Sequence, residues 1–405
     1  MADTYNNVTE KTSKKCSAMN FPWGAWPYQE VLATDTRRFT DGECSLTVRR
    51  FYCSSGLAHV QAADLYVSTS GDDSNPGTSA LPFRTITNAY SQASAGDTIH
   101  VQAGIYHDYN SRWGIHLGKS GTASSPIVLH SETRGGAIID GQNAADRNVG
   151  FYIDGDYNVV DGFEIRNNPN GGITIWSDGN GLINNDIHDN GTPASTSSNG
   201  RNGVYSNEGT SDNYYANNDI HDNGRSGSRL DHGLYLCGQS ETVLNNLLYR
   251  NAGSGLQIAG YTTVSNLKVY NNVMAWNGTE GIILWMKLDG VDIKNNIVYA
   301  NALYGVHAYH VRGKGVVLDH NLVNGNGLGD YDFLSDGSKR WYTLGETITD
   351  APHFVSNSAE SFDPHLSSSS PAIGTGLNLS STFTFDFDNE QRPSTGNWDL
   401  GAYVH

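Results

Sequence analysis

Arginine, histidine and tyrosine side chains gather at two neighbouring places in this chain of 405 residues. Arg229, His232 and Tyr235 lie close together, and Arg201 and Tyr205 form a similar group upstream. A guanidinium can bind a carboxylate through two parallel N–H groups, while an imidazole can accept a proton and a phenol can donate one. Together these residues could remove a proton beside a carboxylate and protonate a departing oxygen. We therefore treat Arg229 and Arg201 as carboxylate ligands, His232 as the base, and Tyr235 or Tyr205 as the acid or shared acid and base.

A second group lies further along the chain. Lys287 is a further catalytic candidate. Trp285 stands two residues before it, and His307 and Tyr309 follow on the next repeat. Indole and phenol rings present flat apolar faces with a polar edge, which suits contact with a sugar ring. We expect eight residues to bind substrate: Trp176, Arg201, Asn207, Asp231, Gln257, Trp285, His307 and Tyr309.

An internal repeat must position these side chains. A glycine precedes a short alternating strand seven times, at Gly150, Gly172, Gly203, Gly233, Gly255, Gly281 and Gly305. Asparagine pairs recur between these glycines, at residues 167–168, 184–185, 217–218, 245–246, 271–272 and 295–296. Repeats of this length indicate stacked coils, because one coil cannot bury its apolar face alone. Asparagine tolerates a left-handed backbone and can bridge one coil to the next.

Strand alternation predicts which side chains leave the core. If Ile173, Ile175, Leu234 and Leu236 face inward, the residues between and beyond them face out. The outward set is Thr174, Trp176, Tyr205, Asn207, Tyr235, Cys237, Gln257, Ala259, Ile283, Trp285, His307 and Tyr309. Strict alternation turns His232 inward, and Asp231 could orient it. Residues 191–202 and 224–232 lengthen their coils and should project as loops beside the outward set.

The repeats resemble those of right-handed parallel β-helix proteins. Residues 65–68, 71–77, 82–86, 96–99 and 104–106 resemble the N-terminal cap of secreted members, and residues 370–374, 386, 391–393 and 399–403 resemble the closing segment. The resemblance implies an all-β fold in one β-helix domain over residues 63–405. It divides into a cap at 63–125 with a short helix at 88–95, coils at 126–330 and an irregular closing segment at 331–405. Residues 1–62 form an extension.

The same resemblance covers several activities, including polysaccharide lyases, glycosidases, uronan epimerases and phage tailspikes. The residue inventory favours a polysaccharide lyase acting on an acidic, uronate-containing polymer, with alginate first and pectate second. A glycoside hydrolase needs paired carboxylates, and Glu208, Asp231 and Glu280 stand at non-equivalent positions. Asp231-His232 is one residue out of register with the Asp-x-His motif of the epimerases. A non-catalytic carbohydrate-binding or adhesin-like protein is the remaining alternative.

Composition limits the partners. The formal net charge is −17, which disfavours nucleic-acid binding, and no apolar run is long enough to span a membrane. We expect an acidic polysaccharide as the partner, a monomer, and no cofactor, although calcium is possible at Asp154, Asp156 and Asp161. We expect a secreted or periplasmic protein, since residues 49–64 resemble a secretory signal with its cleavage site. Cys44 and Cys53 could pair across a hairpin.

Overall fold

The computed structural model describes residues 62–109, 113–144, 149–191, 200–333 and 341–405. The chain divides into one unit of Met1–Gln61 with Leu379–Thr384, and a second unit of Ala62–Asn378 with Phe385–His405. In the described part of the first unit, the carbonyl of Leu379 accepts a hydrogen bond from the N–H of Thr382. All features below belong to the second unit. The proposed extension and its cysteines lie outside the described residues, apart from Ala62.

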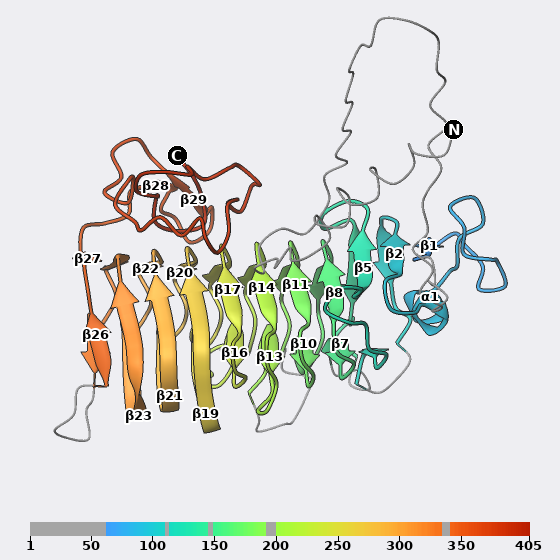
Figure 1. The fold of residues 1–405 in the computed structure, drawn as a ribbon, viewed down its shortest axis with the longest axis horizontal. Coiled ribbons are helices and arrows are strands. Elements are labelled where there is room, and N and C mark those ends of the chain that lie inside the picture. The colour runs from blue at the N-terminus through green and yellow to red at the C-terminus, as the bar shows by residue number, and fades with distance from the viewer. Residues whose placement is uncertain (1–61, 110–112, 145–148, 192–199, 334–340) are drawn as a thin grey trace, which may run out of the picture. The chain divides into compact units, whose positions relative to one another are not determined.

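The second unit is a right-handed parallel β-solenoid of about nine turns, as the sequence predicts (Figure 1). Three parallel ladders of strands form its walls, and each complete turn contributes one strand to each ladder. We number the ladders in the order in which a coil passes through them. Among the described residues, no helix is long and apolar enough to cross a membrane.

The strands of each ladder pair in register with their neighbours. Ladder 1 contains β4 (Ile115–Leu117), β7 (Val149–Ile153), β10 (Gly171–Ile175), β13 (Val204–Ser206), β16 (Leu234–Leu236), the first halves of β19 (Leu256–Tyr270), β21 (Ile282–Lys294) and β23 (Tyr304–Asp319), and β25 (Gly329–Phe333). Ladder 2 contains β1 (Asp64–Val67), β2 (Thr98–Val101), β5 (Ile127–Ser131), β8 (Asn158–Asp161), β11 (Gly181–Ile183), β14 (Tyr214–Ala216), β17 (Thr242–Leu244), the second halves of β19, β21 and β23, and β26 (Tyr342–Leu344). Ladder 3 contains β3 (Gly104–Tyr106), β6 (Ala137–Asp140), β9 (Glu164–Arg166), β12 (Asp186–His188), β15 (Asp219–His221), β18 (Leu247–Tyr249), β20 (Val273–Ala275), β22 (Ile297–Tyr299), β24 (Asn321–Asn324) and β27 (Thr347–Ile348).

The interior of the solenoid is a continuous apolar stack. Ile173 on β10, Val204 on β13 and Leu234 on β16 are fully or almost fully buried and pair in register. Burial of each such side chain stabilises the fold by roughly 1.5–3 kcal/mol. This register repeats through every coil and forces the intervening residues of ladder 1 to the outside, as alternation predicts.

In the asparagine pairs at the corner between ladders 2 and 3, the two residues have different structural roles. The second residue of most pairs is buried and bonds to the next coil, as in Asn185 Nδ2 to Asn218 Oδ1 at 3.1 Å and Asn218 Nδ2 to Asn246 Oδ1 at 2.9 Å. The first residue has a left-handed backbone, as at Asn245 with φ 51° and Asn271 with φ 54°. A further inward row follows ladder 3 at Asn168, Asn190, Asn223, Asn251, Asn277, Asn301 and Asn326. Asn168 belongs to this second row and not to the corner row in which the repeated pairs placed it.

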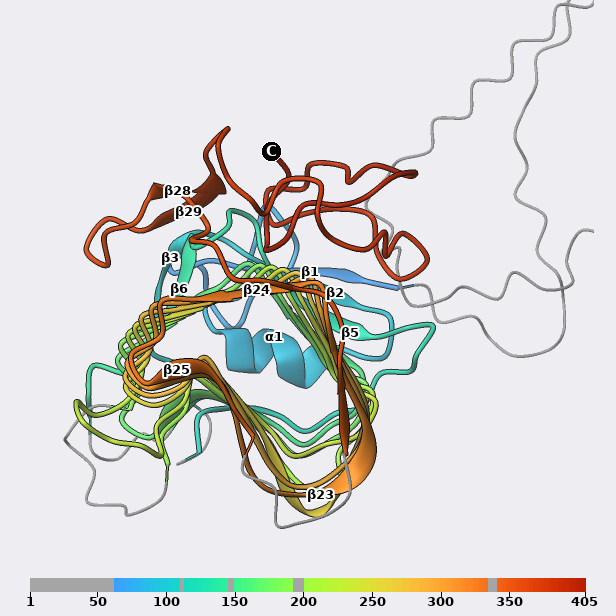
Figure 2. The same cartoon turned by 90° about the vertical axis from the view of Figure 1, so that its left-hand side faces the viewer.

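A short helix covers the N-terminal end of the coil stack (Figure 2). The helix α1 (Ile86–Gln92) lies across the hollow of the coil at the N-terminal end (Figure 2). It begins two residues earlier than the predicted 88–95, because the Thr85 side chain accepts a hydrogen bond from the Asn88 N–H at 3.2 Å and caps it there. It ends at Gln92 rather than at residue 95, and Ala93 is its C-cap.

The closing segment folds back over the outer face of ladder 3 (Figure 2). It contains the antiparallel pair β28 (Phe354–Ser356) and β29 (Asp363–Leu366). Its apolar residues bury Val273 and Ile297 in a second hydrophobic cluster. The left-handed asparagines hold it, since Asn271 donates to the Asp399 and Gly401 carbonyls at 2.9 and 3.0 Å. The closing segment thus covers ladder 3 and leaves the outer face of ladder 1 uncovered (Figure 2).

Candidate active site

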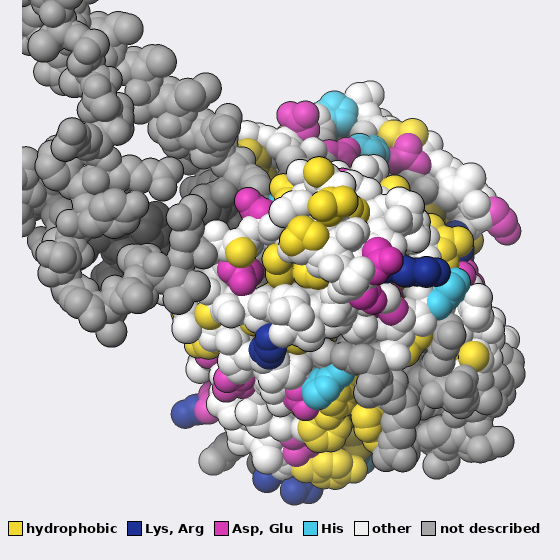
Figure 3. Space-filling model, turned by 90° about the vertical axis from the view of Figure 1, so that its right-hand side faces the viewer, with side chains coloured by type: hydrophobic (Ala, Val, Ile, Leu, Met, Phe, Trp, Pro, Cys, Tyr) yellow, Lys and Arg dark blue, Asp and Glu magenta, His cyan; other side chains and the backbone are white. Residues whose placement is uncertain are grey.

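A groove of about 670 Å³ runs over the outer face of ladder 1. Its floor consists of the outward residues of four successive strands: Tyr152, Thr174, Tyr205 and Tyr235. The other described lining residues are Trp113, Val149, Asn170, Trp176, Gly200, Arg201 and Asn202. We call it the tyrosine groove. In the view onto the N-terminal end of the second unit, hydrophobic side chains gather at the lower edge (Figure 3).

Aromatic rings make the floor and the wall of the tyrosine groove. Tyr205 and Tyr235 pack edge to face with centroids 5.4 Å apart. Trp113 and Tyr152 stack at 6.1 Å. Trp176 stands at the side with 50% of its surface exposed. Exposed and adjacent aromatic faces are suited to sugar rings, so the expected binding role of Trp176 agrees with its place on the lining.

Two of the three floor phenols, Tyr205 and Tyr235, are held in the protonated form. Burial raises the pKa of Tyr205 and of Tyr235 above the usual value. Both hydroxyls bond the thiol of Cys237, and burial raises the pKa of that thiol to about 12. The Tyr205 hydroxyl also donates to Asn207 Oδ1 at 3.0 Å. A phenol in this state can donate a proton at neutral pH and can accept one only after it has ionised.

Arg201 is the cation of the tyrosine groove. It lines the groove although only 1% of its surface is exposed. Burial lowers the pKa of its guanidinium, which stays charged at neutral pH because arginine starts far above it. The backbone N–H of Arg201 donates to Asp231 Oδ1 at 3.0 Å, and Nη1 of the guanidinium donates to the Gly191 carbonyl at 3.4 Å.

Asp231 is a buried anchor for the loop. Its carboxylate receives Arg225 Nε at 2.7 Å and Nη2 at 2.8 Å, in a bidentate pair. Although burial raises it, the Arg225 guanidinium and backbone donors hold the pKa of Asp231 below its usual value. The side chain is fully buried and does not line the groove. Its carboxylate contacts are to Arg225 and the Arg201 backbone, and not to His232, which the sequence analysis expected it to orient.

His232 lies behind Tyr235 and faces away from open solvent. The ring is 1% exposed and packs edge to face on Tyr235, with centroids 5.5 Å apart. Burial lowers the pKa of His232 to about 4, so the imidazole is neutral at pH 7. Its Nδ1 accepts from the Ser254 N–H at 3.2 Å, and the Ser254 hydroxyl lies 2.7 Å away. A backbone N–H can only donate, so the ring proton resides on Nε2. This tautomer favours a hydrogen-bond donor over the base that the sequence suggested.

Two of the predicted catalytic cations lie away from the tyrosine groove. Arg229 is exposed on its loop and is absent from the described lining. Lys287 is exposed on β21, where it pairs in register with Arg312 of β23. Gln257 faces outward in register with Tyr235, one strand beyond the groove. The structure thus brings Arg201, Tyr205 and Tyr235 together but leaves Arg229 and Lys287 outside.

A histidine between two carboxylates lies further along ladder 1. His307 Nδ1 is 3.2 Å from Glu280 Oε1, and its Nε2 is 3.6 Å from Asp332 Oδ2. Although burial raises it, the bond to His307 keeps the pKa of Glu280 below its usual value. Both acids are engaged with one imidazole. Glu280 and Asp332 are therefore the two acids on ladder 1 that we would consider first as the carboxylate pair of a hydrolase.

A buried polar cluster lies inside the coil, directly beneath the groove floor. Ser206 faces inward between Tyr205 and Asn207, and its hydroxyl donates to Glu241 Oε1 at 2.5 Å. Tyr215 donates to the same oxygen at 3.2 Å. Burial raises the pKa of Glu241 to about 7. The floor of the groove therefore rests on a carboxyl group that changes charge near neutral pH.

The acids suggested for calcium are separately engaged. Asp154 pairs with His116 at 2.6 Å and Asp161 with His130 at 2.8 Å. Asp156 Oδ1 accepts from the Asp178 N–H at 3.0 Å. These three carboxylates therefore have different partners and do not converge on one point.

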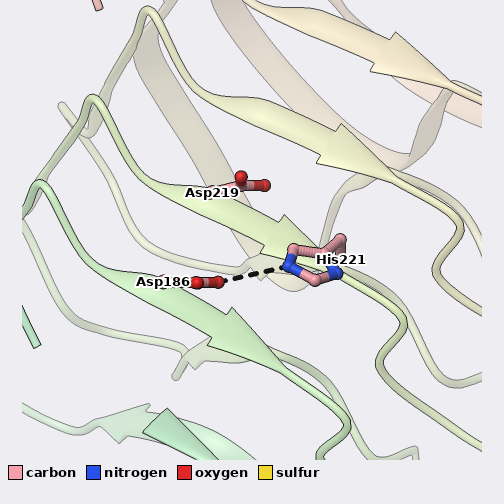
Figure 4. A group of neighbouring side chains, drawn as sticks. All are labelled: Asp186, Asp219 and His221. Carbon is pink, nitrogen blue, oxygen red and sulfur yellow. Dashed lines mark ion pairs between the residues drawn. The ribbon is translucent and has the colours of Figure 1, made fainter. Parts of the chain in front are cut away.

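A different group of possible metal ligands lies on ladder 3. Asp186, Asp219 and His221 have ligand atoms within 4.8 Å of one another (Figure 4). His221 Nε2 is 3.2 Å from Asp186 and its Nδ1 is 2.7 Å from Asp222. Although burial lowers it, these bonds raise the pKa of His221 to about 10. In the absence of a metal the ring is therefore an imidazolium, paired with Asp186 and Asp222.

Sequence reasoning missed several lining residues. Tyr152 could have been found by parity, because Phe151 and Ile153 on either side of it face the core. Trp113 stands before the regular repeats, and nothing in its sequence neighbourhood indicates its stacking on Tyr152. Asn170 and Asn202 each lie just before the strand of their coil, where the alternation is not yet established.

Comparisons with known proteins agree with this architecture. Residues 65–229 match the family model described as "Pel9A-like, right handed beta helix region". A 125-residue stretch is 36% identical to the pectate lyase PEL9 of Emericella nidulans, and covers 28% of this chain and 30% of that protein. Pectate lyase L of Dickeya dadantii is 25% identical over 282 residues, which are 59% of this chain and 66% of the relative. The chain thus spans under a third of the fungal relative and just under two thirds of the bacterial one.

Solved structures share the fold. The crystal structure of pectate lyase Pel9A superposes with a TM-score of 0.59 at 19% identity, covering 86% of this chain and 98% of that one. The complex of XylC with xylose gives 0.52 at 15% identity, covering 71% and 70%. The chain is a right-handed parallel β-helix protein similar to the polysaccharide lyases of this fold.

Proposed function

We propose that this β-helix protein, which resembles polysaccharide lyases, cleaves an acidic uronate polymer by β-elimination in the tyrosine groove. The observation that carries the proposal is that Arg201, a buried cation, is one of the lining residues of a groove whose floor holds the Tyr205 and Tyr235 phenols. Among the described lining residues none is acidic, which suits a polyanionic substrate. The names of the relatives support a pectate-type galacturonan at least as much as alginate, the first choice from the sequence.

In the proposed reaction, Arg201 binds the carboxylate of the sugar that loses its proton. Pairing with the guanidinium stabilises the negative charge that develops when the C5–H bond breaks. The ionised Tyr235 takes the C5 proton, the C4–C5 double bond forms, and the C4–O bond breaks. The same phenol then returns its proton to the leaving oxygen. Tyr205 and the exposed ring of Trp176 hold the neighbouring sugars.

His232 has a supporting role in this scheme. Its Nε2–H is a neutral donor behind the Tyr235 ring, and its ring is fixed by Ser254. A donor near the phenol could stabilise the phenolate without adding a cation. His232 is therefore a positioning residue in the proposal.

A panel assay tests the reaction. The protein is incubated with polygalacturonate, alginate, hyaluronan, chondroitin sulfate and a neutral glucan, with ultraviolet absorbance and reducing ends followed together. We expect absorbance from unsaturated uronate ends on one acidic polymer. Reducing ends without absorbance would indicate hydrolysis and direct attention to Glu280 and Asp332. Absence of both would refute the proposal and favour an epimerase or a binding protein.

The proposal extends to location and assembly. A polysaccharide chain is degraded outside the cytoplasm, so we propose a secreted or periplasmic protein. We also propose that it acts as a monomer, without nucleic-acid or membrane partners. The pectate lyases among the relatives support this location.

A further inference from the structure

The corner between ladders 1 and 2 changes along the solenoid. In the coils of β10, β13 and β16 a turn separates the strand of ladder 1 from the strand of ladder 2. β19, β21 and β23 instead run through the corner as single strands of 15, 13 and 16 residues (Figure 1). The corner of these three coils is therefore a surface of paired strands without intervening turns.

Local irregularities aim side chains outward at this corner. The register between β21 and β23 shifts after Trp285, where β23 contains one extra residue. Met286 and His310 take left-handed φ values of 71° and 52°. Bulges and left-handed residues re-aim neighbouring side chains and often occur beside functional surfaces.

Three aromatic rings project from the irregular corner. Tyr261 is 70% exposed and Tyr309 is 44% exposed. Trp285 is half-buried between them, in register with Tyr309 and 6.3 Å from the Tyr261 ring. The strands that carry these rings lie about 4.8 Å apart. Exposure of this size in a row of three is unusual for structural aromatics.

Two cations flank the aromatic row. Lys287 and Arg312 are exposed and stand opposite each other on β21 and β23. In a chain with a net charge of −17, neighbouring like charges repel and are retained at a cost. Glu208 is the acid nearest Tyr261 and accepts from its backbone N–H. We call Tyr261, Trp285, Lys287, Tyr309 and Arg312 the corner platform.

The corner platform continues the surface of the tyrosine groove. Tyr235 of the groove pairs in register with Gln257 of β19, which pairs with Ile283 of β21. Two strand steps, about 10 Å, therefore separate the floor of the groove from the strand that carries Trp285 and Lys287. A polymer that lies along ladder 1 reaches both.

We infer that the corner platform is a distal subsite that binds further anionic sugars of the chain cleaved in the tyrosine groove. The aromatic faces carry the sugar rings, and Lys287 with Arg312 binds uronate carboxylates. The inference rests on the proposed function for its substrate class. The platform makes the protein favour long chains over short ones, since only long chains occupy both places.

Binding without catalysis tests the platform directly. The wild type, Trp285→Ala/Tyr309→Ala and Lys287→Ala/Arg312→Ala are run on native gels that contain alginate, polygalacturonate or a neutral glucan. We expect at least one acidic polymer to retard the wild type and each double variant to lose most of that retardation. Phe385→Ala, an exposed aromatic in the closing segment, is the matched control and should migrate like the wild type. Equal retardation of the double variants, or retardation by neutral glucan alone, would overturn the inference.

Chain-length kinetics separates the platform from the reaction. On the polymer that is cleaved, the ratio of kcat/KM for polymer to that for a trisaccharide should fall at least tenfold in Trp285→Ala/Tyr309→Ala. A constant ratio would refute the distal subsite while leaving the lyase reaction intact. Loss of retardation in a protein that cleaves none of the polymers would support the subsite and refute the proposed reaction.

Discussion

The oxygen atom of Tyr235 carries the proposed proton transfer. Tyr235→Phe removes it and keeps the ring that packs on Tyr205 and His232. We expect kcat/KM on the acidic polymer to fall more than tenfold, with a melting temperature within about 2 °C of the wild type, because only the hydroxyl's bonds to Cys237 and Gln257 are lost. Tyr299→Phe, on ladder 3, is the control. A fully active Tyr235→Phe would exclude this phenol from the reaction.

The pH dependence distinguishes the two possible bases. Burial raises the pKa of Tyr235 above 10, so the ionised fraction, and with it log kcat/KM, should rise with pH up to at least pH 10. A base at His232, whose pKa is about 4, would instead give a plateau above about pH 5. The measurement is kcat/KM across the pH range, with the melting temperature recorded at each pH. A neutral plateau would transfer the role to His232.

Arginine geometry gives a third test at this scale. Arg201→Lys keeps the charge but loses the fork that binds a carboxylate through two N–H groups. We expect kcat/KM to fall by about tenfold or more, and Arg229→Ala to cost less, because Arg229 lies outside the described lining. Arg84→Lys, in the cap, controls for the substitution. A larger loss in Arg229→Ala would restore the assignment made from the sequence.

Individual residues also mark the limit of sequence reasoning. Alternation identified Tyr205, Tyr235 and Trp176 as outward, and they line the groove. It could not rank Arg201 against Arg229, because both lie in loops where parity has no meaning. Nor could it foresee the Asp231–Arg225 pair, which depends on a loop conformation and not on strand register.

At the scale of elements, a buried acid supports the floor of the groove. The pKa of Glu241 rises from 4.5 to about 7 on burial, so the folded state prefers the protonated form. This contribution to stability is complete below pH 4.5 and is lost as the pH rises toward 7, at about 1.4 kcal/mol for each pKa unit. Glu241→Gln keeps the acceptor for Ser206 and should reduce the loss of melting temperature between pH 5 and 8 by several degrees.

The Glu241 test needs a reference. Glu346→Gln removes one acid on the surface and should leave the pH profile of the melting temperature like that of the wild type. If Glu241→Gln shows the same slope as the wild type, Glu241 stays ionised in the core throughout. The polar contacts beneath the groove would then have to stabilise a full charge.

Element boundaries were predictable only where the repeat is regular. The glycine positions gave every coil start from Gly150 to Gly305, and the asparagine pairs marked the corner. The long strands β19, β21 and β23 were not foreseen, because Gly260, Gly290, Gly313 and Gly315 indicate turns, whereas the strands run on through these glycines. The second asparagine row was missed because the residues before each asparagine differ from coil to coil and include histidine, tyrosine and alanine.

At the scale of the molecule, the excess of acidic residues raises the question of whether the reaction needs a metal ion. No acid lines the described part of the groove, and the suggested calcium ligands have separate partners. We therefore expect turnover on the acidic polymer to change by less than about twofold after exhaustive chelation, with unchanged melting temperature. Activity that disappears with chelator and returns with calcium would refute this and indicate a metal bound by substrate carboxylates together with the protein.

The constant rise of the coils has a further consequence. Groove and platform are fixed at two strand steps on a scaffold that neither stretches nor rotates between them, so the solenoid acts as a ruler for the bound chain. Deleting the coil of β19, which lies between the strands of Tyr235 and Trp285 and carries Tyr261 of the platform, would shorten the ruler by about 4.8 Å and bring the cut closer to the anchored end. The distribution of product sizes, measured from the first minutes of digestion, would then shift by about one sugar.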